Sequence, residues 1–225
     1  MRHGLVCLIT VVALAATATA WPPIEEIAQA IAPLELPAEA MILETFELGL
    51  AQGRLLPEDA LRLIGRLDQA AGTPVERERV LLIIADALHD DLPVTMLVSK
   101  ASEGLARRIR LPVIAQGLAQ RMALLVEVRA LLWAKGIIVS DEETSLPQAL
   151  PQERFERLVN VIAEVLGDHL AGGGSPLDGF GLYEEVERRL NWLASSSVIP
   201  AEDAELALSR IGPEDLTNVA IKALD

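Results

Sequence analysis

One set of charged side chains recurs at helical spacing and is the first candidate for a binding site. Lys100, Glu103 and Arg107 are three and four residues apart, which places them on one face of a helix. Arg108 and Arg110 add positive charge beside them. Such a basic patch could bind a carboxylate, a phosphate or an acidic partner. The simpler interpretation is a solvated helix face with ordinary ion pairs, each contributing a few tenths of a kcal/mol.

The histidines and glycines form no recognisable catalytic or metal-binding motif. His89 is followed by two aspartates, but neighbouring residues on a helix point apart, so a histidine at a helix C-terminus is the simpler interpretation. His169 follows Asp168, and we interpret the two as a turn ion pair. The glycine-rich residues 171–181 lack the Gly-Lys-Ser/Thr ending of a phosphate-binding loop and are interpreted as a linker. We predict no metal, no cofactor, no catalytic residue and a protein that is not an enzyme.

The N-terminus predicts export. Residues 1–20 combine an early arginine, an apolar run from Leu5 to Ala16 and a small-x-small ending at Ala20, which is the pattern of a signal peptide. The run is too short to span a hydrocarbon core of about 30 Å comfortably, which disfavours the alternative of an N-terminal membrane anchor. Cleavage would remove Cys7, the only cysteine in the sequence. We expect a periplasmic or secreted protein with no disulfide and no stable transmembrane anchor.

The charge of the chain narrows the classes of partner. The formal net charge is −14, which disfavours general binding to nucleic acid or to anionic membranes because phosphates are repelled at long range. Aromatic residues make up 3% of the chain, so stacking surfaces for single-stranded nucleic acid are also scarce. We interpret the acidic balance mainly as a contribution to solubility, and we expect no nucleic acid among the partners.

Prolines divide the chain into segments with the spacing of amphipathic helices. Proline suits the first turn of a helix, where its missing N–H would have no partner. Between the prolines, apolar residues recur at steps of three and four, and "KGIIV" (135–139) is the nearest approach to a strand but is too short to seed a sheet. We therefore predict an all-α protein: an irregular multi-helix bundle of about nine or ten helices with short proline-started joints. Seven prolines follow Leu or Ile and precede helix formers: Pro37, Pro57, Pro93, Pro112, Pro147, Pro151 and Pro200.

The spacing of the prolines also suggests an alternative architecture. Between Pro37 and Pro112 they lie 17 to 20 residues apart, which is compatible with a short α-solenoid of helical hairpins. We favour the bundle because the regular spacing covers only this part of the chain. After the signal peptide, we predict a main helical unit at 21–139 and a C-terminal helical part at 140–225, with a glycine-rich connection at 171–181.

A short joint with one pattern recurs three times. We interpret it as a packing device that closes one helix, buries two aliphatic residues in the elbow and starts the next helix. In the first copy, Gly53 is the expected helix cap, so Gly49, which opens the pattern, lies inside the helix. Glycine there makes a helix less stable than alanine would, and a close approach of another element would offset this loss of stability. The copies are "GLAQGRLLP" from Gly49 to Pro57, "GLARRIRLP" from Gly104 to Pro112, and "WLASSSVIP" from Trp192 to Pro200.

The second copy lies in a segment that resembles a family of uncharacterised, exported, helical bacterial proteins. "KASEGLARRIRLP" (100–112) is similar to their Lys-x-x-Glu-Gly-x-Ala-Lys-Gly-Val-Pro segment, with arginines in place of the second lysine and the second glycine and two extra residues before the proline. The resemblance implies an exported helical protein and brings no activity with it. The matching positions are Lys100, Glu103, Gly104, Ala106 and Pro112.

These observations predict an exported, non-enzymatic helical protein that acts through protein–protein or cell-envelope contacts. The alternative is a carrier that binds an apolar ligand between its helices. A carrier predicts a large, closed, apolar cavity, whereas an interaction protein predicts a dense core and an exposed binding patch.

Overall fold

The fold is that of a computed structural model, which describes residues 24–139 and 149–224. Within these ranges the chain forms ten α-helices, a short 3-10 helix (Ala32–Leu34) and two strands of two residues each. This confirms the predicted all-α class and the number of helices. The helices are α1 (Ile24–Ile31), α2 (Glu39–Ala51), α3 (Pro57–Gln69), α4 (Pro74–His89), α5 (Thr95–Ala106), α6 (Leu111–Ala134), α7 (Gln152–Ala171), α8 (Gly179–Ser195), α9 (Ala201–Arg210) and α10 (Pro213–Lys222).

Several helices begin at the prolines. Pro57, Pro74 and Pro213 are the first residues of α3, α4 and α10, where the ring fits the required φ and no N–H is lost from the helix ladder. Pro112 is the second residue of α6, and Pro200 directly precedes α9. The proline-started joints are therefore present in the structure.

Helix α4 has an additional N-terminal cap. The Glu76 amide donates to Thr73 Oγ1 at 3.3 Å, and the Thr73 amide donates to Glu76 Oε2 at 2.8 Å, so two amides at the start of the helix find partners. The predicted signal peptide (1–20) lies outside the described residues.

The recurring joint ends each helix with one residue in the left-handed conformation. This residue is Gly53 in the first copy (φ +69°), as predicted, and Arg108 in the second (φ +57°). In both copies the next amide donates back to the carbonyl of the opening glycine, over 2.8 Å to Gly49 and 3.0 Å to Gly104. In the third copy the left-handed residue is Ser197, one position later than in the other two copies, because α8 continues for one residue further.

The two opening glycines lie inside helices at close crossings. Gly49 is buried in α2, and a Cβ built on it would lie 2.8 Å from Leu88 Cδ2 of α4. Gly104 is buried in α5, and its Cβ would lie 2.9 Å from Ile114 Cγ1 of α6. Each glycine therefore makes room for an aliphatic side chain of a helix that packs across it.

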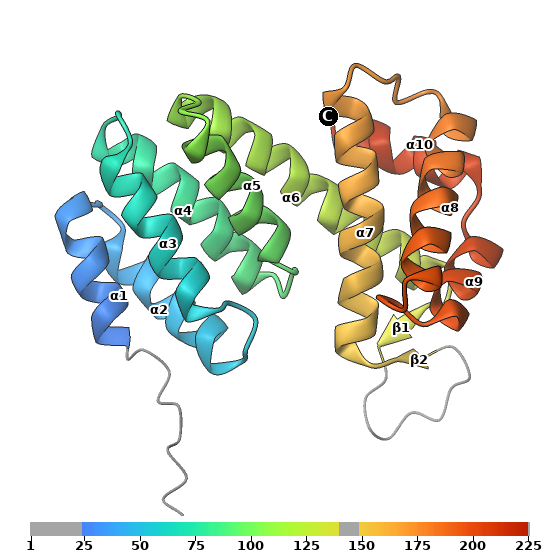
Figure 1. The fold of residues 1–225 in the computed structure, drawn as a ribbon, viewed down its shortest axis with the longest axis horizontal. Helices are drawn as coiled ribbons and strands as arrows, with labels where there is room; N and C mark the ends of the chain where they lie inside the picture. Colours follow the sequence, from blue (N-terminus) through green and yellow to red (C-terminus); the bar gives the residue numbers. More distant parts are fainter. Residues whose placement is uncertain (1–23, 140–148, 225) are drawn as a thin grey trace, which may run out of the picture.

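The first six helices form two layers of three (Figure 1). Helices α1, α3 and α5 pack in order in one layer, while α2, α4 and α6 pack in order in the other. Each helix thus contacts the helix two places further along the chain. This is the order of stacked helical hairpins, and it spans the region in which the prolines are evenly spaced.

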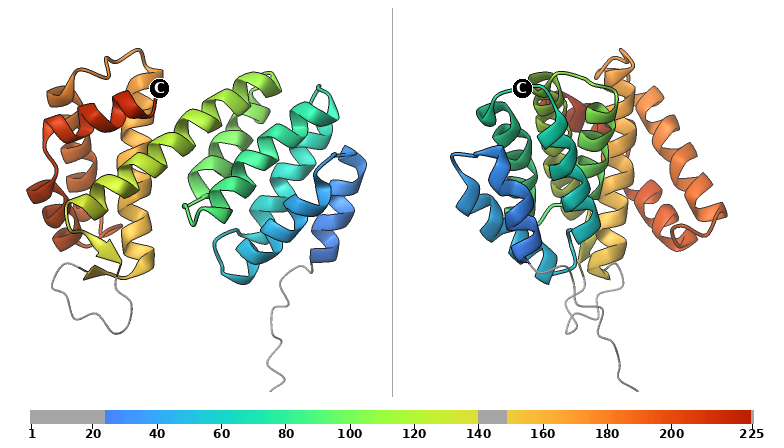
Figure 2. Two further views of the ribbon diagram at one scale, coloured as in Figure 1. Left: turned by 180° about the vertical axis from the view of Figure 1, so that it is seen from behind. Right: turned by 60° about the vertical axis from the view of Figure 1, so that its left-hand side comes forward.

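Helix α6 connects this stack to the rest of the bundle. It has 24 residues and a length of about 36 Å. It packs on α4 and α5 in the stack and on α7 and α10 beyond it, and Figure 2 shows it crossing from one part to the other. By length and composition it is the one described helix that could cross a membrane, with 39% of its most apolar window buried. Its place at the centre of the bundle accounts for this apolar composition.

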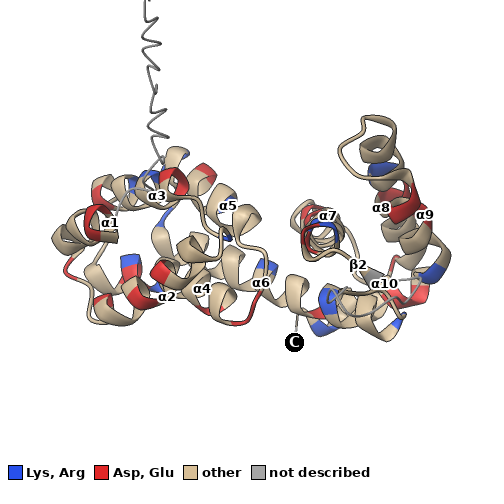
Figure 3. Ribbon diagram, turned by 90° about the horizontal axis from the view of Figure 1, so that it is seen from below, with Lys and Arg blue, Asp and Glu red and all other residues tan. Residues whose placement is uncertain are grey.

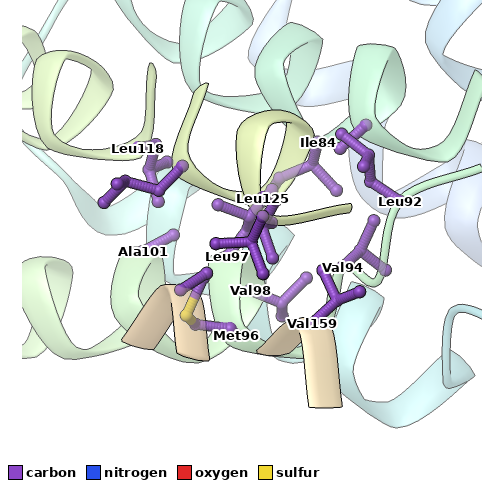
Figure 4. Close-up of a cluster of buried hydrophobic side chains, with 14 of the residues drawn as sticks. Ile84, Leu92, Val94, Met96, Leu97, Val98, Ala101, Leu118, Leu125 and Val159 are labelled. Atoms are coloured by element: carbon purple, nitrogen blue, oxygen red, sulfur yellow. The ribbon is translucent and has the colours of Figure 1, made fainter. Parts of the chain in front are cut away.

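The buried apolar residues form one contiguous core that extends through both parts. Leu97 of α5 and Leu125 of α6 lie at the centre of the cluster drawn in Figure 4. Val159 of α7 approaches Val94 and Val98 there, so the first turns of α7 close the core on the side of the stack. The position of α7 is thereby fixed relative to α5 and α6.

The C-terminal helices pack around α7, and an ion pair holds one of them. Arg154 of α7 donates from Nε to Asp203 Oδ2 at 2.8 Å and from Nη2 to Glu202 Oε1 at 2.6 Å. Asp203 is 1% exposed, and its hydrogen bond raises the pKa of Arg154 above its ordinary value, with a further contribution from Glu202. The pair therefore joins α7 to α9 in its charged form.

The glycine-rich connection is shorter than the predicted 171–181. Helix α7 continues to Ala171, and α8 already begins at Gly179, so the connection covers residues 172–178. A Cβ at Gly179 would lie 2.5 Å from the Pro213 carbonyl oxygen, so this glycine allows α8 to begin against α10. Gly179 has a packing role that the linker interpretation missed.

Two short strands lie between α6 and α7. β1 (Ile138–Val139) pairs in parallel with β2 (Ala149–Leu150), with Ile138 opposite Ala149. The "KGIIV" segment does therefore form a strand of two residues, since β2, the next strand along the chain, supplies its partner. The pair brings the end of α6 close to the start of α7.

Candidate functional site

The predicted basic patch is divided between ion pairs and an exposed joint. On α5, Arg107 Nη2 lies 2.7 Å from Glu103 Oε1, and Lys100 Nζ lies 3.9 Å from Glu103 Oε2. Arg108 closes α5 and Arg110 precedes α6, and both are exposed. The five residues therefore do not converge on one point.

Lys100 takes part in a cluster that joins three helices. Its Nζ lies 3.6 Å from Asp168 Oδ1 of α7, and Arg121 Nη2 of α6 lies 2.5 Å from the same oxygen. The Arg121 side chain is mostly buried, so the shared carboxylate compensates its charge. Glu103 and Asp168 therefore balance the charge of Lys100 within the protein, and the Lys100 side chain extends from α5 toward α7.

The histidines lie apart from one another. His89 is the exposed last residue of α4, a position where a histidine faces the helix C-terminus. His169 does not pair with Asp168; its Nδ1 lies 3.4 Å from Glu185 Oε2 of α8. Across residues 24–139 and 149–224, no group of three or more His, Cys, Asp or Glu side chains is arranged to hold a metal ion.

A large concave feature is an open cleft between the stack and α7, with a volume of about 1360 Å³. One wall comes from the end of α2 and the α4–α5 connection. The other comes from the end of α6, β1 and the first turns of α7. Figure 3 shows α7 end-on beside the stack, with α6 running past both. We call this feature the α7 cleft.

Arg54 is the central polar residue of the first wall. The left-handed Gly53 ends α2 and sends the chain back, so that the Arg54 side chain reaches the end of α4. Its Nη1 donates to the Leu88 carbonyl at 3.2 Å and to Asp91 Oδ1 at 2.5 Å, and its Nη2 donates to the Leu92 carbonyl at 3.0 Å. The guanidinium therefore caps α4 and is held in a single position.

One donor of Arg54 is left without a partner. Nε is buried and makes no hydrogen bond with any described residue. Glu156 Oε1 of α7 lies 4.0 Å from Nε, which is too long for a hydrogen bond. That oxygen instead accepts from Gln152 Nε2 at 2.5 Å. The cleft thus contains a fixed, buried and unused N–H group.

The opposite wall contains an unused acceptor. Asn160 lines the cleft from α7, and its Oδ1 is buried without a hydrogen-bond partner among the described residues. Residues 156 and 160 are one helical turn apart and therefore lie on one face of α7. Buried polar atoms without partners are rare because each costs about 1–3 kcal/mol. Arg77 Nε and His169 Nε2, which lie away from the cleft, are buried without a described partner in the same way, so such atoms do not by themselves mark a ligand site.

An exposed tryptophan provides the apolar surface of the cleft. Trp133 of α6 is 55% exposed, and its ring is tilted over buried Phe155 of α7 with 6.4 Å between the ring centroids. Val94 and Val159 also line the cleft and belong to the apolar cluster of Figure 4. Tryptophan on a rigid base is the residue type that contributes most often to binding energy at protein interfaces.

The remaining charged groups of the cleft are mixed in sign and largely paired. Arg157 donates to Glu153 Oε1 at 2.5 Å and to the Val198 carbonyl at 2.6 Å. Arg129 donates to the Asp90 carbonyl. Both arginines pair within the protein itself, so the α7 cleft is a polar and aromatic surface without a strong electrostatic field of one sign.

The sequence signals did not identify this cleft. Arg54, Trp133 and Asn160 come from three separate segments, and only the packing of α7 against the stack brings them together. The one local signal was the position of Trp133, a scarce aromatic residue at the end of the long, apolar helix α6. Its polar neighbours in the cleft have no spacing that would have singled them out.

Comparison with known proteins identifies no relative: no family model, no curated protein and no solved structure matches this chain. The resemblance of residues 100–112 to exported helical proteins stays a prediction, and in the structure that segment forms most of α5 and its joint to α6.

Proposed function

We propose that this chain is an exported, non-enzymatic protein that binds a protein partner in the α7 cleft. The observation that carries the proposal is the exposed Trp133, held over buried Phe155 in a large open cleft that is lined by charged side chains of both signs. Export rests on the predicted signal peptide at residues 1–20.

The size and polarity of the cleft favour a macromolecular partner. Pockets for small molecules have volumes of about 300–1,000 Å³ and enclose most of their ligand. The α7 cleft is larger and open, and charged side chains of both signs line it. The carrier alternative requires a closed apolar cavity, so the cleft offers it little support. Material extracted from the purified protein and examined by mass spectrometry should contain no stoichiometric lipid, whereas a bound lipid would favour the carrier.

The experiment is a selection on the purified mature protein. A phage-displayed library of random dodecapeptides is panned against it, and enriched peptides are synthesised and measured by isothermal titration calorimetry. Trp133→Ala should weaken their binding at least about tenfold through loss of the aromatic contact. Trp192→Ala is the matched control, because Trp192 of α8 is 54% exposed but lies away from the cleft.

A second cleft variant guards against a structural effect of Trp133→Ala. Gln52 is exposed at the end of α2 and lines the cleft, so Gln52→Trp should fill part of it without disturbing the core. Weakened binding in both cleft variants and unchanged binding in the control would support the proposal. Failure to enrich any peptide, or binding that neither cleft variant alters, would overturn it.

A further inference from the structure

The most exposed large apolar side chains of the described residues all lie in or beside turns at one end of the molecule. Phe180 is 76% exposed, Leu177 is 72% exposed and Val75 is 64% exposed. Figures 1 and 2 show the α3–α4 turn, the α5–α6 joint, the 172–178 connection and the end of α10 at this same end, which we call the turn end. Six exposed apolar residues belong to these segments or to the helix turns beside them: Val75, Ile109, Val113, Leu177, Phe180 and Leu224.

Leu177 and Phe180 are exposed although hydrogen bonds hold the chain around them. The Leu177 amide donates to Ser175 Oγ at 3.2 Å. The Gly181 amide donates to Asp178 Oδ1 at 3.0 Å, and this contact caps α8 one residue before it begins. The backbone is therefore ordered while the two apolar side chains remain in solvent. Apolar side chains gathered on one exposed side of a protein indicate an interaction surface.

The turn end also presents arginines to solvent. Arg108 and Arg110 lie in the α5–α6 joint, and both are exposed. The neighbouring carboxylate of Glu103 is already engaged by Arg107 and Lys100. Arginine binds phosphate through several directed hydrogen bonds. Apolar side chains and phosphate-binding groups are thus combined at one end of a chain whose formal net charge is −14.

This arrangement fits a lipid surface better than a single protein segment. The apolar residues come from four separate segments, which Figure 1 shows spread along the long axis from the stack to α8. One peptide or loop would not reach all of them, whereas a bilayer interface accepts apolar side chains at any spacing and offers phosphates throughout. Zwitterionic lipids carry these phosphates without a net charge, so the acidic chain is not repelled at long range.

We propose that the turn end binds the surface of a phospholipid bilayer. The apolar side chains of the four segments enter the boundary between headgroups and acyl chains, and Arg108 and Arg110 donate to lipid phosphates. The α7 cleft is built from the opposite ends of the helices, so it stays open to a protein partner when the turn end lies on a bilayer. This inference goes beyond the proposed function, and neither depends on the other.

The test measures flotation of the purified mature protein with phosphatidylcholine vesicles. The wild-type protein should float with the vesicles. A double variant, Leu177→Ser with Phe180→Ser, should lower the partition coefficient at least about tenfold, because its two largest projecting apolar groups are lost. The matched control is Leu48→Ser with Leu56→Ser, at the end of α2 and in the joint that follows it, where the side chains are 57% and 49% exposed. That control lies at the opposite end and should bind like the wild type.

Two further variants report on the contact itself. The sequence has one cysteine, Cys7, inside the predicted signal peptide, so Leu177→Cys in the mature protein can carry a single nitrobenzoxadiazole label. Its emission should shift to shorter wavelength when vesicles are added, whereas a label on Leu48→Cys should not respond. Arg108→Gly removes a phosphate contact without backbone strain, since φ is +57° there, and should weaken binding by up to about fivefold.

The outcomes separate this inference from the proposed function. If the wild-type protein does not bind the vesicles, the inference is wrong, and the turn end is then a surface for a protein partner. Equal loss of binding in the two double variants, or an equal response of the two labels, would also overturn it, because binding would then not depend on the turn end. Trp133→Ala, which tests the α7 cleft, should leave vesicle binding unchanged.

Discussion

Replacing Gly104 by alanine should destabilise the protein, although alanine is the better helix former. Gly104 is buried in α5 with an ordinary helical backbone, and its built Cβ would lie 2.9 Å from Cγ1 and 3.1 Å from Cδ1 of Ile114. Favourable carbon–carbon contacts lie at about 3.5–4.0 Å. Ile114 is buried and β-branched, so its side chain has few alternative rotamers with which to relieve the overlap.

The expected magnitude follows from two opposing effects. Alanine in a helix interior is favoured over glycine by about 1 kcal/mol. Overpacking in a well-filled core costs about 1–3 kcal/mol. We expect Gly104→Ala to lower the free energy of unfolding by about 1 kcal/mol, and Gly104→Val, with two further methyl groups, to lower it by about 3 kcal/mol.

Urea denaturation followed by circular dichroism at 222 nm measures both changes. Gly65→Ala is the matched control, because Gly65 lies inside α3 and a Cβ there would have no neighbour within 4 Å. That variant should gain about 0.5–1 kcal/mol from helix propensity alone. If Gly104→Ala is stabilised as much as Gly65→Ala, the close-crossing explanation of the repeated glycine is refuted.

Three further predictions concern polar groups and export. Asn160→Leu should raise the free energy of unfolding by about 1 kcal/mol in urea, because it removes a buried acceptor that has no partner, and a destabilised variant would argue against that assignment. Asp203→Asn should lower the free energy of unfolding by about 1–3 kcal/mol, because Arg154 loses its buried partner. Glu202→Gln, at an exposed position, should change the free energy of unfolding by less than about 0.5 kcal/mol. Equal effects of the two variants would contradict the role of burial. Intact mass of the exported protein should correspond to a chain that begins at Trp21, and a full-length chain retained in membranes would contradict cleavage after Ala20.

The parts of the fold that depend on neighbouring residues could be predicted from the sequence. Proline marks a helix start through its own ring, and Gly53 ends α2 through its own backbone freedom, so both were recognisable without a structure. The third copy of the joint differs from the other two by one residue, because α8 continues for one residue further before Ser197 takes the left-handed conformation. Local pattern alone could not detect that shift.

The parts that depend on distant residues could not be predicted. The close approach of Gly179 to α10 requires two helices that meet only in the folded chain, so the glycine was taken for part of a linker. The five charged residues from Lys100 to Arg110 were grouped by spacing, but Asp168, far along the chain, takes one of them into a contact between helices. The α7 cleft likewise exists only because α7 packs beside the stack. The spacing of residues in the sequence does not reveal that packing.

The most direct test of the central claim is the fluorescence of Trp133 during peptide binding. In a mature protein carrying Trp21→Phe and Trp192→Phe, Trp133 is the only tryptophan. It is 55% exposed in the free protein, so a peptide selected on the wild-type cleft should bury it and shift its emission to shorter wavelength, saturating at one peptide per chain. Saturable binding with unchanged Trp133 emission would contradict the assignment of the α7 cleft as the binding site.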